Sequence, residues 1–271
     1  MDLAAAPADV EPSVSPAAAA SETPTARGFY RSLEALAPSK HGALKIDRSR
    51  AAFDFARGVN LAPISVGEFG QAALSYPIVF VGEAKVPCAV MGLRRGVNAF
   101  INADGAIDAA HYIPATLRQY PFALAKDPDA ERIVLCVDRG ADMVNETTGV
   151  ALFEGGEPSS FTEEAMKFLR GMERQRAETE AFIKTLIELD LFETKELKMM
   201  KRGEPGEARV LTTYDAISET KLAALAADTL GSLVTRKYMF LIGAHQVSLF
   251  NWNRLTMLSL QEAEGQERLA G

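Results

Sequence analysis

The sequence has little cysteine and no excess of basic residues. It contains only Cys88 and Cys136, which lie in apolar runs that predict β-strands, so we expect two small buried thiols and no disulfide framework. Acidic residues outnumber basic ones by 36 to 29, and no long lysine or arginine block occurs. With a formal charge of −7, the chain is a poor match for the phosphate backbone, and we expect no nucleic-acid partner.

Long hydrophobic runs are also lacking. The most apolar late stretch, Tyr238 to Phe250, is shorter than the ~20 residues that span a bilayer, and it contains His245 and Gln246. We interpret it as a buried helix. The N-terminus has no basic region followed by an apolar one, which argues against a secretory signal. These absences predict a soluble, cytoplasmic protein without a transmembrane segment.

Aromatic residues are missing from the first 26 positions, which consist mainly of alanine, proline, serine, threonine and acidic residues. Such a composition buries too little apolar surface to offset the entropy lost on ordering. We therefore expect residues 1–27 to form a disordered tail.

The remaining sequence predicts two parts of one domain. Residues 28–158 read as a β-rich part with short inserted helices, one of them from Ser65 to about Ser75. We expect strands within 43–47, 77–82, 131–138 and 149–154, and a hairpin of strands 88–94 and 97–102 that turns at Arg95-Gly96.

Residues 159–271 read as the helical part. Apolar residues recur at helical spacing from Phe161 to Leu189, and Ser160 with Glu163 suits a capping box at the start. One hairpin is expected from the stretches "KELKMM" and "ARVLTTY", followed by a helical tail with a break that ends near Leu260. The predicted fold class is α+β, because strands come in runs and do not alternate with long helices.

Motifs that would fix an activity are absent. The sequence has no phosphate-binding loop, no glycine-rich dinucleotide motif and no G-x-S-x-G nucleophile elbow. The three histidines lie far apart, so we expect neither a metal nor a cofactor. Asp104 and Asp108 near His111 could form an acid/base or hard-ion cluster, although Asp104-Gly105 also reads as an ordinary turn.

Two groups of residues are candidates for ligand binding. The first is His245 with Trp252, which helical spacing places with Ser248 on one side of the C-terminal helix. These residues either line a pocket or belong to the core, where buried polar groups find local partners.

The second group lies in "YIPATLRQYPF", where Pro114 and Pro121 restrict the backbone on either side of about one helical turn. We expect a rigid corner that buries Tyr112, Tyr120 and Phe122, with Arg118 projecting inward or into a cleft. A guanidinium held in this way either binds an anionic ligand such as a carboxylate or ties the loop to the core.

Several stretches together resemble the SapC family of bacterial proteins, over roughly residues 29–257. They are "EFGQAALSYPIVF", "GVNAFINADG", "YIPATLRQYPFAL", "RIVLCVD" and "LIGAHQVSL", in this order. The insertion "RGADMVNETTG" is longer than the family pattern predicts. Ala106-Ile107 stands where a tryptophan often follows in the family.

The resemblance implies a role beside surface-layer or other cell-envelope systems, or beside TonB-dependent uptake. We expect a non-catalytic binding or accessory protein with a protein, peptide or small-molecule partner. The alternative is an enzyme or enzyme partner that modifies a peptide or small molecule beside halogenase-like and cupin-like proteins. The resemblance assigns no catalytic residue.

Overall fold

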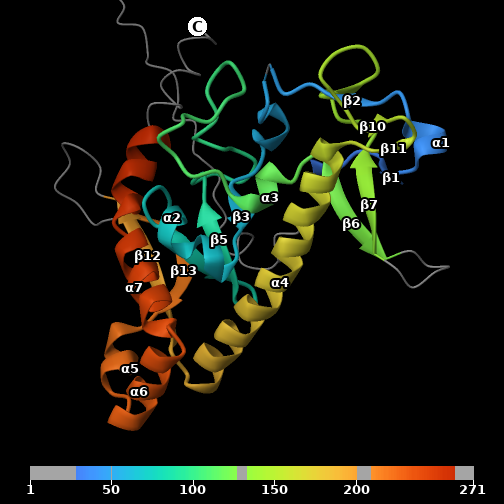
Figure 1. Cartoon of the computed structure of the whole chain (residues 1–271). Coiled ribbons are helices and arrows are strands. Elements are labelled where there is room, and N and C mark those ends of the chain that lie inside the picture. Colours follow the sequence, from blue (N-terminus) through green and yellow to red (C-terminus); the bar gives the residue numbers. More distant parts are fainter. Residues whose placement is uncertain (1–28, 50, 127–132, 200–208, 260–271) are drawn as a thin grey trace, which may run out of the picture.

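A computed structural model describes residues 29–49, 51–126, 133–199 and 209–259. The expected N-terminal tail lies outside these residues. The described chain is α+β, with a β-rich N-terminal region that carries short helices and a helical C-terminal region that carries one hairpin, as the sequence predicted (Figure 1).

The largest sheet draws its five strands from both regions, in the order β12-β13-β4-β5-β3. All its neighbours are antiparallel, and Asp215 of β13 pairs with Phe80 of β4. Every residue of β4 is buried, because β13 and β5 flank it and the His245 ring packs 5.1 Å from that of Phe80. The strands are β3 (Leu61–Pro63), β4 (Ile78–Val81), β5 (Val86–Val90), β12 (Phe192–Met199) and β13 (Arg209–Ile217).

Smaller sheets lie at the other end of the molecule (Figure 1). One has the order β1-β7-β6, and in another β2 lies between β8 and β9, while β10 and β11 form a separate hairpin. The strands are β1 (Leu33–Ala35), β2 (Lys45–Ile46), β6 (Phe122–Lys126), β7 (Ile133–Asp138), β8 (Val144–Asn145), β9 (Val150–Ala151), β10 (Phe153–Glu154) and β11 (Glu157–Pro158).

The helices are mostly short, apart from one long helix. The short ones are α1 (Pro38–His41), η2 (Asp54–Ala56), η3 (Val66–Glu68), α2 (Phe69–Ala72), α3 (Ala115–Arg118), α5 (Glu219–Ala223), α6 (Ala227–Thr235) and α7 (Tyr238–Ser248). Residues 251–259 are again helical. Among the described residues, no helix combines the length and the apolar character that crossing a membrane requires.

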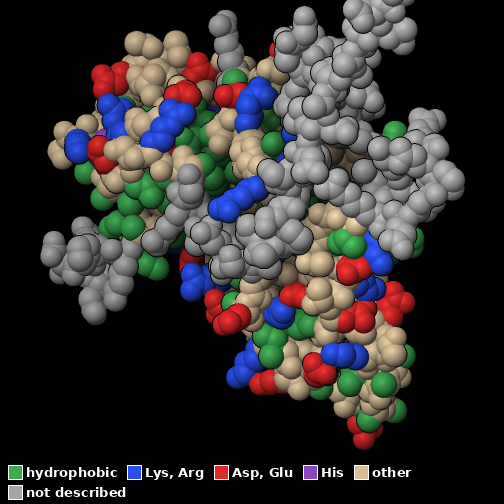
Figure 2. All heavy atoms as spheres, turned by 180° about the vertical axis from the view of Figure 1, so that it is seen from behind, with side chains coloured by type: hydrophobic (Ala, Val, Ile, Leu, Met, Phe, Trp, Pro, Cys, Tyr) green, Lys and Arg blue, Asp and Glu red, His purple; other side chains and the backbone are tan. Residues whose placement is uncertain are grey.

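The long helix α4 (Ser160–Glu188) runs between the small sheets and the five-stranded sheet (Figure 1), and it packs against a hydrophobic cluster at each end. Its first half packs through Leu169 against the cluster around the β1-β7-β6 sheet. Its second half packs through Phe182, Ile183 and Leu186 against the cluster around the five-stranded sheet. On the face seen in Figure 2, basic and acidic side chains are interspersed.

One expected hairpin is wrong. Residues 97–102 do not form a strand opposite β5, although Val97, Ala99 and Ile101 alternate as in a strand. The Asn98 side chain instead accepts a hydrogen bond from the Phe100 N–H and donates one to the Ala56 carbonyl. Such local side-chain bonds compete with a ladder, and the partners of β5 are β3 and β4.

The expected start of α4 is displaced by one residue. Ser159, and not Ser160, is the N-cap: its Oγ accepts a hydrogen bond from the Thr162 N–H at 3.4 Å. The same hydroxyl donates to the Ala151 carbonyl at 2.6 Å. Ser159 therefore joins the helix start to β9, a contact that the serine pair in the sequence does not reveal.

Candidate functional site

The segment that carries Arg118 forms the expected corner. Pro114 holds extended backbone before α3, and the single turn of α3 directs Leu117 into the core and leaves Arg118 exposed. A cis Tyr120–Pro121 bond follows, and Tyr120 and Phe122 are buried. The backbone of the corner therefore fixes the position from which the Arg118 side chain projects outward.

Two hydrogen bonds and two aromatic rings hold the Arg118 side chain. Its Nε donates to the Ile113 carbonyl at 3.0 Å, and its Nη2 donates to the Tyr112 hydroxyl at 2.9 Å. The guanidinium carbon lies 5.5 Å from the centre of the Tyr112 ring and 5.0 Å from that of Phe168. A guanidinium has five N–H groups, so these bonds position it and leave further donors for a ligand.

A buried carboxylate holds Tyr112 in place. The Tyr112 hydroxyl donates to Glu68 at 3.1 Å, and Glu68 also accepts hydrogen bonds from the Ala115 N–H and from the N–H and hydroxyl of Ser65. Burial and the Glu68 charge raise the pKa of Tyr112 to about 12, and Arg118 opposes that rise. Tyr112 is therefore a neutral phenol that connects Arg118 to Glu68.

Arg118 lines a small open pocket between α3 and α4, with a volume of about 210 Å³. The side of the pocket formed by α4 is mainly apolar. A second guanidinium, that of Arg48, lies in the same wall and donates to the carbonyl groups of Tyr120 and Arg118. The lining residues are Arg48, Arg118, Gln119, Phe122, Phe161, Glu164, Ala165, Phe168 and Leu169.

The pocket carries a positive charge balance. In the part of the chain that the structure describes, neither Arg48 nor Arg118 forms an ion pair with a carboxylate, and Glu164 is the one acidic residue of the lining. Burial lowers the pKa of Arg48, although arginine stays charged at any physiological pH. The arrangement can accept an anionic group from one side and an apolar body against α4.

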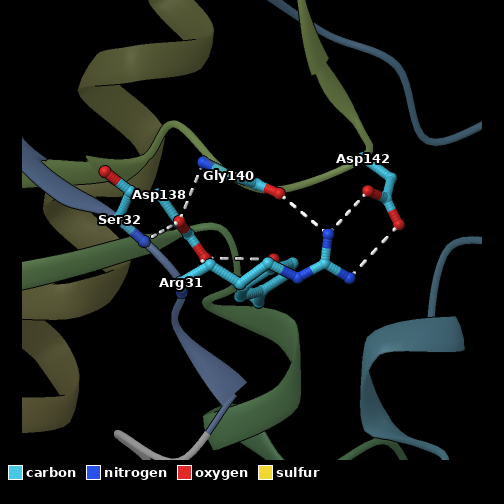
Figure 3. A network of polar contacts seen from close by, with 6 residues as sticks. Arg31, Ser32, Asp138, Gly140 and Asp142 are labelled. Carbon is cyan, nitrogen blue, oxygen red and sulfur yellow. Dashed lines mark hydrogen bonds and ion pairs between the residues drawn. The ribbon is translucent and has the colours of Figure 1, made fainter.

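Tyr120, which the sequence analysis grouped with Arg118, does not line this pocket. Its ring stacks on Phe55 at 3.9 Å, and its hydroxyl donates to Asp138 at 3.2 Å. The fully buried Asp138 carboxylate also accepts from the N–H groups of Arg31, Ser32 and Gly140 (Figure 3). This network fastens β1 to the end of β7, and its buried acceptors are occupied.

His245 and Trp252 do not line the pocket of Arg118. His245 is fully buried, its Nε2 accepts the Ile217 N–H at 3.1 Å, and burial lowers its pKa to about 4. The neutral ring therefore carries its proton on Nδ1. The Ser248 hydroxyl accepts the Ile78 N–H, and the Trp252 ring packs on Tyr214. The three residues do share one side of the helical segment, as expected. That side packs against the five-stranded sheet and belongs to the core.

His111 also packs among aromatic rings. His111 lies 5.0 Å from the Phe100 ring, and burial lowers its pKa. Asp108 accepts the Ala110 N–H in its own turn, and Gly105 closes the turn that contains Asp104. Within the described ranges, no group of three or more histidine, cysteine, aspartate or glutamate residues could hold a metal ion.

A family model described as SapC matches residues 36–255. The chain belongs to the SapC family. Searches of curated proteins and of solved structures found no match. The matched range contains α3, α4 and the pocket between them, so the site lies within the SapC part of the chain.

Sequence reasoning missed Arg48 and Glu68 in this SapC protein. Glu68 had a local signal, because Ser65 and Glu68 have capping-box spacing, and the box is formed. Arg48 had none: it follows β2 and lies 70 positions before Arg118, whose carbonyl it contacts. Phe161 and Phe168 had only the helical spacing of α4, which indicates a packed face and not a pocket wall.

Proposed function

We propose that this SapC-family protein is a non-catalytic binding protein that takes a small carboxylate with an apolar body into the pocket between α3 and α4. One observation carries the proposal: Arg48 and Arg118 line the same pocket, and neither has a carboxylate partner among the described residues. Arginine donates to carboxylates in a planar, paired geometry.

The chemistry of the pocket favours a ligand with a single negative charge. Two arginines and one glutamate leave the lining with a net charge of +1. Phe161, Phe168 and Leu169 offer aromatic and aliphatic surface, where each buried CH₂ contributes about 0.8 kcal/mol. The volume of about 210 Å³ suits a short chain or one small side chain of a peptide.

Calorimetry with a matched pair of probes tests this proposal. Hexanoate should bind and hexanamide should not, because the amide lacks the charge that the guanidinium groups attract. Arg118→Lys should weaken hexanoate binding ~10-fold or more, since an ammonium cannot reproduce the fork of donors. The control Arg176→Lys, an exposed arginine on α4 that pairs with Glu180, should leave binding unchanged.

Two results would overturn the ligand assignment. Equal binding of the acid and the amide would remove the role of charge, and unchanged binding by Arg118→Lys would place the ligand elsewhere. Elemental analysis and an absorption spectrum test the non-catalytic part of the proposal. Stoichiometric iron, zinc or flavin that survives dialysis would favour an enzyme or enzyme partner instead.

The proposal extends to the system that the protein serves. The family resemblance supports an accessory role from the cytoplasm for a cell-envelope, surface-layer or TonB-dependent uptake system. A strain that lacks the gene should lose surface-layer assembly or receptor-dependent uptake, and a copy with Arg118→Lys should restore it poorly. Normal assembly and uptake in the deletion strain would contradict this role.

A further inference from the structure

The outer face of the C-terminal helical segment exposes a row of large apolar side chains. Phe240 is 66% exposed, Val247 56%, Phe250 79% and Met257 60%. Their spacing of seven, three and seven residues is the a/d spacing by which helices pair in coiled coils. We call these four residues, together with Leu74, the apolar stripe.

The stripe continues across the break between α7 and residues 251–259. At the break, the N–H of Phe250 bonds to the Val247 carbonyl at 3.2 Å, which tightens the turn without ending the helical path. The opposite face of the helical segment is buried both before and after the break. Its buried residues are Ile242, His245 and Ser248 before the break and Trp252 and Leu255 after it. The exposed residues therefore share one side of the helical segment.

Leu74, which is 71% exposed, widens the stripe from the neighbouring chain. The Asn251 side chain donates to the Ala73 carbonyl and Arg254 donates to the Leu74 carbonyl, so Leu74 adjoins the middle of the stripe. Since a whole aromatic side chain covers roughly 150–250 Å², the stripe presents on the order of 500 Å² of apolar surface. A standard interface buries about 800 Å² on each partner, so the stripe supplies most of the surface that one partner contributes.

The spacing is symmetric about its own midpoint, between Ser248 and Leu249. An antiparallel second copy would place Phe240 opposite Met257 and Val247 opposite Phe250, and each pair would occur twice, as a twofold interface requires. We propose that this protein forms a homodimer through the apolar stripe, with the helical segments 238–259 of the two copies antiparallel. This inference is independent of the proposed ligand pocket.

Charge and side-chain size favour the antiparallel direction. Arg254 is the only charged residue from 238 to 259. In a parallel pair the two Arg254 side chains would meet. In the antiparallel pair they are separated by 11 residues, about 16 Å of helix and more than a Debye length at physiological salt. Each Arg254 then lies opposite Gly243, where a Cβ would meet no atom within 4 Å.

Sedimentation velocity of the full chain tests the association. The wild type should be a dimer at micromolar concentration, and Phe250→Glu should raise the dissociation constant ~30-fold or more, as the loss of a central aromatic anchor does. Phe250 is exposed in a single copy, so its replacement should not destabilise the monomer. At dilutions where the wild type is monomeric, Phe250→Glu and the wild type should therefore have the same melting temperature. The control Ile133→Glu, at a 55% exposed apolar residue on β7, should remain dimeric.

Cross-linking tests the direction. A mixture of the single variants Phe240→Cys and Met257→Cys should form a disulfide-linked dimer on mild oxidation, whereas Phe240→Cys alone should not. The native Cys88 and Cys136 are buried and free, so they do not interfere. A wild type that stays monomeric at ~100 µM, whether or not it binds lipid vesicles, would overturn the proposal. So would a dimer that survives Phe250→Glu.

Discussion

Asp138 shows how much one buried side chain can organise. Its carboxylate accepts from two N–H groups of the chain before β1, at Arg31 and Ser32, and from Gly140 and the Tyr120 hydroxyl. Asp138→Asn should lower the free energy of unfolding by about 2–3 kcal/mol, because an amide replaces one acceptor oxygen by donors. Urea denaturation measures this.

The matched control for Asp138 is Asp142→Asn. Asp142 lies shortly after Asp138 in the chain and forms an ion pair with Arg31 (Figure 3). Its side chain, however, is 82% exposed. Exposed ion pairs contribute little, so this variant should unfold at nearly the urea concentration of the wild type. Equal losses for both aspartates would show that the buried network contributes no more than the exposed pair.

His245 makes stability depend on pH. Its pKa is about 4 in the folded chain and near 6.5 when unfolded, so the unfolded chain binds the extra proton first as pH falls. Its contribution is complete above pH ~6.5 and declines between pH 6.5 and 4, by up to about 3 kcal/mol. His245→Gln should flatten this part of the stability curve, whereas the less buried His111→Gln should preserve most of it. Unchanged slopes would contradict the assignment.

At the scale of elements, Phe182 of α4 packs between α2 and α7, beside the five-stranded sheet. Phe182 is fully buried, 5.9 Å from the Phe69 ring and 5.0 Å from the Tyr238 ring. Phe182→Ala should destabilise the protein by about 3–5 kcal/mol, because it leaves a cavity. Ile187→Ala on the same helix, at a 47% exposed position, should cost far less. Urea denaturation of both variants measures this difference. Similar denaturation midpoints for the two variants would mean that α4 is loosely packed.

Periodicity and turn residues predicted most elements but not their neighbours. Helix α4, strands β4 and β7 and the β12–β13 hairpin follow from local patterns. The pairing of β13 with β4 has no local signal, since Asp215 and Phe80 meet only through folding. The error at 97–102 came from alternation that Asn98 overrides through local bonds. Likewise, Arg118 and Tyr112 could be found in one motif, but Arg48 could not.

At the scale of the whole molecule, α4 makes the two hydrophobic clusters interdependent. We propose that the described residues unfold as one unit. Leu169 belongs to the cluster around β1-β7-β6, while Trp252, the only tryptophan, belongs to the other. Leu169→Ala should therefore shift the Trp252 fluorescence transition and the circular dichroism transition to the same lower denaturant concentration. An unshifted fluorescence transition would show that the clusters unfold separately.

The strand order of the five-stranded sheet also has a consequence during synthesis. Strands β3, β4 and β5 leave the ribosome early. One edge of the apolar β4 remains unpaired until β13 is made, about 130 residues later. At 5–20 residues per second, that edge stays open for roughly 6–25 seconds. An open, apolar edge invites pairing with other nascent chains. Slow translation of the last third of the message should therefore increase the dependence of this protein on chaperones.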